Sequence, residues 1–138
     1  MFKKVVYLAL VVSLMVSMLA ACRSGDEVNL DGTKWALTSL NGSSPIGEAN
    51  FTLVFSEGRV SGKSGCNSYF SDYTQDGESL SISMLGSTLM ACIEPAGLMD
   101  QETEFQSVLK DVDSFSIEGD QLRLETPDGL FLLFEAQE

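Results

Sequence analysis

The sequence predicts an α+β domain in which an antiparallel sheet packs against a single amphipathic helix. First, apolar and polar residues alternate in several short runs, a pattern typical of half-buried strands. Second, turn-forming residues separate these runs, and tight hairpins join antiparallel rather than parallel strands. Third, the segment 98–112 carries apolar residues at helical spacing, and such a helix must bury its apolar stripe against the sheet.

The expected strands each contain apolar residues at alternate positions. They are 35–37, 51–55, 80–84, 115–117, 122–124 and 130–134. Asn-Gly at 41–42 and Asp-Gly at 76–77 and 128–129 supply the positive φ that tight turns require. The run 130–134 is apolar at every position, so it is either a central core strand or the lining of a cavity. In the helical segment, acidic residues lie in the first half and Lys110 lies near the end, which complements the helix dipole.

The first part of the chain, 1–21, has the pattern of a secretory signal peptide. Lys3 and Lys4 precede an apolar run at 5–21 that ends in small residues. The alternative is a membrane-spanning helix, which normally needs about 20 apolar residues. The sequence Leu-Ala-Ala-Cys at 19–22 resembles a bacterial lipobox, which favours cleavage before Cys22 and lipidation of its sulfur. Residues 22–29 are then the lipidated cysteine and a short linker, and 30–138 form the domain.

Lipidation at Cys22 predicts a membrane partner. Each buried methylene contributes about 0.8 kcal/mol, and several acyl chains, such as palmitate, anchor a protein stably. Arg23 follows the cysteine, where an aspartate would favour the inner membrane, so we expect the outer membrane with the domain facing the periplasm. In a Gram-positive cell, the same motif would place the protein on the outer face of the plasma membrane. The linker 23–29 spans at most about 25 Å.

Composition excludes several classes of function. The chain has 8 basic and 20 acidic side chains, and removal of Lys3 and Lys4 with the signal peptide leaves 6 − 20 = −14. This charge repels phosphate backbones, so nucleic acid is not an expected partner. The chain has no histidine, which excludes a Ser-His-Asp triad, a Cys-His pair and a histidine zinc site. A hydrolase with an unassisted serine or cysteine is the remaining enzymatic hypothesis, and it lacks a base.

Three apparent motifs are incomplete, and we predict no cofactor, metal or catalytic residue. Gly-Lys-Ser at 62–64 resembles the end of a phosphate-binding loop, but Glu57 stands where its first glycine is needed. The run 72–77 resembles the opening of a calcium loop, but its twelfth position is Ser83. Ser61 and Lys63 would share a strand face without the desolvated pocket that activates a lysine, so they are better explained by a surface hairpin.

Cys66 and Cys92 remain once Cys22 is assigned to lipidation. In an exported protein an even pair usually forms a disulfide, which would contribute about 3–4 kcal/mol in the chain-entropy model. The alternative is a reactive thiol, but neither cysteine has a histidine that could stabilise a thiolate.

The residues around these cysteines carry a family resemblance. They are Gly65-Cys66-Asn67 and Thr88-Leu89-Met90-Ala91-Cys92, with Tyr73, Leu80, Glu102, Phe105, an opening run at 30–35 and a closing run at 122–129. This set resembles the META domain, the HslJ-like family of small bacterial envelope proteins, over about residues 30–134. Ser71 departs from the pattern, since the family often has glycine there, which places a local turn in question.

The resemblance implies a curled, partly barrel-like antiparallel sheet with the helix packed against it. It also links the chain to stress response, antibiotic tolerance and, in other lineages, secretion or virulence. It implies no catalytic residues. Asn67 either satisfies backbone groups in a turn or lines a ligand pocket. Tyr69 and Tyr73 are further candidates for ligand or partner contact, with Phe70, although burial of Phe70 and one tyrosine is the alternative.

Two functions therefore remain as expectations. The first is a non-enzymatic lipoprotein that binds or stabilises an envelope protein partner. The second is a carrier of a lipid or other hydrophobic ligand inside the barrel. An apolar void above about 300 Å³ would favour the carrier, whereas a filled interior would favour the binding module.

Overall fold

The computed structural model describes residues 27–138. The predicted signal peptide and the predicted lipidation site, Cys22, lie outside the described residues. Within residues 27–138, no helix has the length and hydropathy that a membrane crossing requires.

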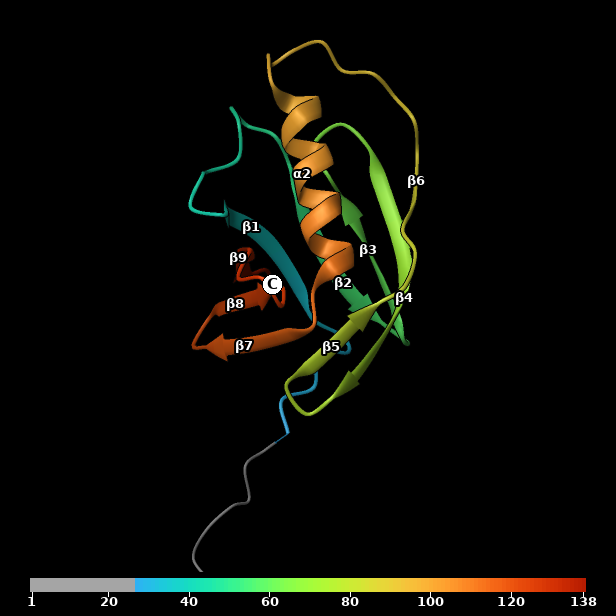
Figure 1. The fold of residues 1–138 in the computed structure, drawn as a ribbon, viewed down its shortest axis with the longest axis vertical. Coiled ribbons are helices and arrows are strands. Elements are labelled where there is room, and N and C mark those ends of the chain that lie inside the picture. Colours follow the sequence, from blue (N-terminus) through green and yellow to red (C-terminus); the bar gives the residue numbers. More distant parts are fainter. Residues whose placement is uncertain (1–26) are drawn as a thin grey trace, which may run out of the picture.

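The described residues form nine strands and one helix (Figure 1). In chain order they are β1 (Lys34–Leu40), β2 (Thr52–Ser56), β3 (Arg59–Lys63), β4 (Ser68–Asp76), β5 (Ser79–Ile82), β6 (Gly86–Ser87), α2 (Leu98–Asp111), β7 (Ser114–Glu118), β8 (Gln121–Glu125) and β9 (Phe131–Ala136). The α+β class and the single helix are as the sequence predicts. The helix ends one residue early, because Val112 adopts an extended conformation.

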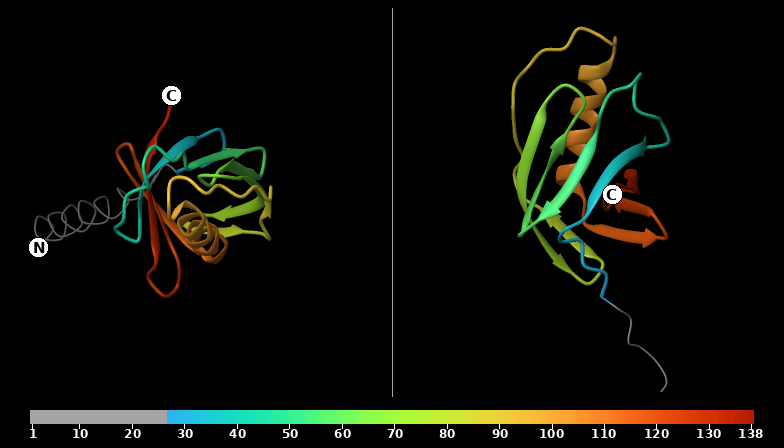
Figure 2. Two further views of the ribbon diagram at one scale, coloured as in Figure 1. Left: turned by 90° about the horizontal axis from the view of Figure 1, so that it is seen from above. Right: turned by 180° about the vertical axis from the view of Figure 1, so that it is seen from behind.

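Eight of the strands close into an antiparallel barrel. The sheet order is β3-β2-β1-β9-β8-β7-β5-β4-β6, and a further pairing between β3 and β4 closes the ring. The join between β5 and β7 is narrow, with Ser79 opposite Ser114 as its register pair. The short β6 extends the barrel wall beside β4, and α2 lies along the opening between this wall and β7–β9 (Figure 2).

The helix fills the barrel with its apolar face. Phe105 lies at the centre, with ring centroids 5.2 Å from Phe51, 5.6 Å from Tyr69 and 6.4 Å from Phe134, all in edge-on arrangements. Such pairs contribute about 0.5–1.5 kcal/mol each beyond area burial. Buried apolar residues from the strands of the barrel surround this cluster. They include Leu53, Val60, Leu80, Phe115, Leu122, Leu124 and Leu132.

The structure differs from the predicted elements around β4. No strand was predicted at 68–76. In β4, Ser71 is buried and Phe70 is 53% exposed, so polar and apolar side chains do not lie on the faces that hydropathy alone would suggest. The hypothesis that Phe70 is buried is therefore wrong. Its ring lies over Gly86 on the neighbouring strand, where a Cβ would be only 2.5 Å from the ring. Ser71 occupies a strand position rather than a turn, so its departure from the family pattern changes no turn.

The observed strand bounds differ from the predicted runs, and two of these differences change which residues are exposed. The predicted run 80–84 forms a strand only as far as Ile82, and Met84 lies exposed in the connection to β6. The run 130–134 becomes a strand from Phe131 onward, with Leu132 and Phe134 in the core and Leu130 at the surface. One face of this strand therefore belongs to the core, whereas Leu133 on the other face borders a surface cavity.

Candidate functional site

The turn between β3 and β4 carries most of the residues that the family resemblance singles out. Gly65 adopts a φ of 95°, and a Cβ at this position would lie 2.7 Å from Cδ1 of Leu98, the first residue of α2. Only glycine satisfies both conditions. The turn therefore packs directly against the start of the helix.

Asn67 connects this turn to the segment 88–97. Its side-chain amide donates to the carbonyl oxygen of Met90 (3.1 Å) and to Oε1 of Glu102 (2.6 Å). Its Oδ1 accepts from the Met90 backbone N–H and from the Thr88 hydroxyl, both at 2.7 Å. With both donors and both lone pairs of the amide in use, Asn67 fulfils the structural role expected of a turn residue.

Glu102 is a buried carboxylate on α2. Its Oε2 accepts the backbone N–H groups of Cys66 and Asn67, both at 2.9 Å, and its Oε1 accepts the Asn67 amide and, at 3.4 Å, Nε2 of Gln106. Among the described residues, none of the ion pairs includes Glu102. The carboxylate is held by N–H donors alone, and it ties the helix to the turn.

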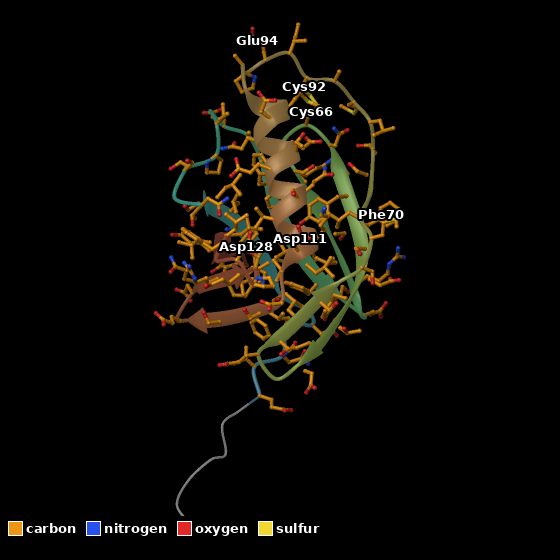
Figure 3. All side chains as sticks on the ribbon, viewed as in Figure 1. Cys66, Phe70, Cys92, Glu94, Asp111 and Asp128 are labelled. Carbon is orange, nitrogen blue, oxygen red and sulfur yellow. A yellow bond between two sulfur atoms is a disulfide. The ribbon has the colours of Figure 1, made fainter. Side chains whose placement is uncertain are left out.

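A disulfide completes the connection. Cys66 and Cys92 are bridged, with their Cα atoms 5.9 Å apart, so the turn and the segment 88–97 are covalently joined beside the start of α2 (Figure 3). The bridge leaves neither sulfur free as a nucleophile.

The candidate residues Asn67, Tyr69 and Tyr73 do not share a pocket. Tyr69 is a core residue whose hydroxyl donates to the carbonyl oxygen of Thr52 (2.6 Å), and burial raises its pKa. Tyr73 packs edge-on against Phe55 near the surface, and burial together with the carboxylate of Asp31 raises its pKa. The three side chains thus have separate surroundings.

Four cavities of the described residues open at the surface. The first, about 590 Å³, lies between residues 27–31 and the β4–β5 turn and includes Tyr73, and a second of about 570 Å³ lies beside the C-terminal strand. Two others, of about 420 and 230 Å³, border β7 and β8. Of the buried core residues, only Phe115 lines any of these four cavities. Side chains fill the barrel interior instead.

The incomplete motifs contribute no site. Nζ of Lys63 donates to Oγ of Ser68 (2.8 Å) at the surface, so the pair with Ser61 has no desolvated lysine. Within residues 27–138, no group of acidic and cysteine side chains is arranged to hold a metal ion.

The segment after β6 presents a feature that the sequence did not reveal. Leu89, Met90 and Ile93 are 96%, 58% and 88% exposed, although the disulfide and Asn67 hold the backbone between them. We call residues 88–93 the apolar loop. The apolar residues of this loop follow no clear period, so the sequence alone does not indicate whether they are buried or exposed.

Fold and site together define a small closed-barrel domain with a disulfide-linked turn, in which the described residues contain no recognisable catalytic constellation. The chain belongs to the META domain family, whose model matches residues 28–138.

Solved structures share this fold. A protein from Burkholderia xenovorans studied by NMR is 28% identical, with a TM-score of 0.63 over 86% of this chain and 94% of that one. A crystal structure of a DUF4847 family protein from Bacteroides vulgatus ATCC 8482 is 14% identical, with a TM-score of 0.59 over 83% of this chain and 100% of that one. No curated protein matches the chain.

Proposed function

We propose that the chain is a non-enzymatic lipoprotein of the bacterial envelope, anchored through Cys22, whose META domain binds a protein partner with its surface. The lipobox-like sequence at 19–22 supports the anchor, and Arg23 supports the outer membrane as its location. The family resemblance supports a role in envelope stress or antibiotic tolerance.

The filled barrel is the observation that carries the binding function. Phe51, Tyr69, Phe105 and Phe134 occupy the centre that a carried lipid would need. In the described part of the chain, every buried side-chain nitrogen and oxygen also has a hydrogen-bond partner, so the barrel interior offers a ligand no unpaired side-chain polar group. Recognition is therefore assigned to the outside of the barrel.

The anchor is tested by labelling cells that produce the full chain with radioactive palmitate. We expect label on the wild-type protein and its recovery with the outer membrane, whereas Cys22→Ala loses both because the acylated sulfur is absent. Cys66→Ser/Cys92→Ser is the matched control and keeps the label. An unlabelled wild-type protein would contradict the proposal.

The choice between binding module and carrier is tested by native mass spectrometry of the lipidated protein released from the membrane in detergent. We expect one species whose mass is explained by the chain, its acyl groups and one disulfide. An additional stoichiometric lipid that survives gentle detergent removal would favour the carrier function instead.

A further inference from the structure

The apolar loop is exposed and yet rigidly held. Its backbone is fixed at Met90 by two hydrogen bonds to Asn67 and at Cys92 by the disulfide, and the N–H of Cys92 points to Sδ of Met99 on α2. A mobile tail could fold its apolar side chains away, but this backbone keeps Leu89 and Ile93 in water. Because hydrogen bonds and a disulfide already hold this backbone, the loop itself loses little conformational entropy when a partner covers it.

Three acidic side chains lie in the segments next to the apolar loop. Glu94 follows it directly, Asp100 lies in the first turn of α2, and Glu48 lies in the 41–51 connection that packs alongside, where Gly47 faces Pro95. Against these three acids, the neighbouring β3–β4 hairpin contributes one base at this end, Lys63. All four charged side chains are exposed.

We propose that the apolar loop is a docking surface for an envelope protein with an apolar cleft rimmed by lysine or arginine. This inference rests on the proposed function and specifies its surface and the chemistry of its partner. Leu89 and Ile93 are the anchors that enter the cleft, and the carboxylates of Glu48 and Glu94 meet its basic rim.

Charge and position favour this occupant over two others. A second copy of the chain would bring the same acidic rim against itself, and an anionic bilayer would repel it. The loop and the first described residues, which lead to the predicted anchor, lie at opposite ends of the molecule (Figures 1 and 2). The loop is therefore far from the point at which the described chain leads toward the proposed anchor.

The test is photocrosslinking in the envelope of cells that produce the full chain. Benzoylphenylalanine replaces exposed Ala96 beside the loop or, as a positional control, exposed Asp120 in the β7–β8 turn. Leu89→Ser/Ile93→Ser removes the anchors and Glu48→Lys/Glu94→Lys reverses the rim, whereas Met84→Ser removes an equally exposed apolar side chain elsewhere. Circular dichroism verifies the fold of each variant, and palmitate labelling is measured in the same cells.

We expect a crosslinked protein from position 96 that is absent from position 120. Its yield falls about tenfold or more in both double variants and is unchanged in Met84→Ser. The crosslinked peptide, identified by mass spectrometry, contains lysine or arginine beside apolar residues. A crosslink to lipid, binding to phosphatidylglycerol vesicles, a crosslinked dimer, or a yield that ignores the rim reversal would overturn the inference. If palmitate labelling persists in that case, the proposed anchor stands and only the docking surface fails.

Discussion

At the residue scale, Glu102 shows how this domain stabilises a buried carboxylate without a cation. The backbone N–H groups of Cys66 and Asn67 converge on one oxygen, and the amide of Asn67 meets the other. Hydrogen bonds to a charged acceptor are about twice as strong as neutral ones, which offsets part of the desolvation cost. The same carboxylate therefore positions the turn, the disulfide and, through Asn67, the apolar loop.

Replacing Glu102 by glutamine tests this role. Glutamine has the same shape but only one acceptor oxygen, so its NH₂ group must face the amide of Asn67 or a backbone N–H. We expect the free energy of unfolding to fall by about 1–3 kcal/mol, measured by urea titration. Glu104→Gln is the control, because this exposed side chain on the same helix should change stability by less than about 0.5 kcal/mol.

An equal loss of stability in Glu104→Gln and Glu102→Gln would contradict the role assigned to the buried carboxylate. It would indicate that lost helix charge, rather than lost acceptor geometry, decides the effect.

At the scale of the elements, the close approach of the paired strands β2 and β3 depends on a glycine. A Cβ at Gly62 would lie 2.0 Å from the carbonyl oxygen of Thr52, which also accepts the hydroxyl of Tyr69. The neighbouring N–H of Lys63 donates to Oγ1 of Thr52 at 2.9 Å. The two strands approach each other too closely here for any larger residue.

We therefore expect Gly62→Ala to separate β3 from β2. The overlap is with backbone, which cannot rotate away as a side chain can, so the free energy of unfolding should fall by at least about 1–3 kcal/mol. Ser61→Ala, on the exposed side of the same strand, is the control and should cost less than about 0.5 kcal/mol. Chemical denaturation of both variants measures the difference, and equal stability would show that the strands are not in this close contact.

At the scale of the whole molecule, the barrel has no free edge along most of its wall. The β3–β4 pairing closes one side, and α2 packs against β5 beside the narrow β5–β7 join. Unpaired edges invite pairing with other chains, so closure protects this domain from edge-to-edge association. The buried rings of Phe105 and Tyr69 lie at the centre of this closed wall.

The buried hydroxyl of Tyr69 predicts how the barrel unfolds in alkali. Burial raises the pKa of Tyr69 above its ordinary value near 10, so above that pH the unfolded state has lost a proton that the folded state retains. The stabilising effect is full below about pH 10 and decreases as the pH rises further. In urea titrations between about pH 10 and 12, we expect the stability of wild type to fall more steeply than that of Tyr69→Phe, by about 1.4 kcal/mol per pH unit.

The absolute stability of Tyr69→Phe should be lower at neutral pH, by about 1 kcal/mol, because Thr52 loses a hydrogen bond. The difference in slope is therefore the informative quantity. Tyr73→Phe is the control and should change the slope less, since Tyr73 lies nearer the surface. Parallel curves for wild type and Tyr69→Phe would contradict the burial of the phenol in the folded state.

Much of the fold followed from local patterns. Alternation at 51–55 and 122–124 and the helical spacing of 98–112 each depend on neighbouring residues, which are visible in a sequence. The strand β4 was not predicted, because Ser71 is buried and Phe70 is exposed. Only the neighbours of these residues across the sheet explain this arrangement. The disulfide was anticipated from cysteine number, but its position beside Asn67 and Glu102 was not.

The sequence by itself determined an antiparallel sheet with one helix, a META domain and the absence of histidine chemistry. Tertiary structure alone decided that the barrel closes and is filled, that Glu102 is buried among N–H donors, and that Leu89 and Ile93 remain in water. The physical reason is distance along the chain. Strand alternation and helix periodicity are local, whereas closure, burial and exposure depend on which distant segments pack together, as the turn at Cys66, the loop at Cys92 and the helix at Glu102 do here.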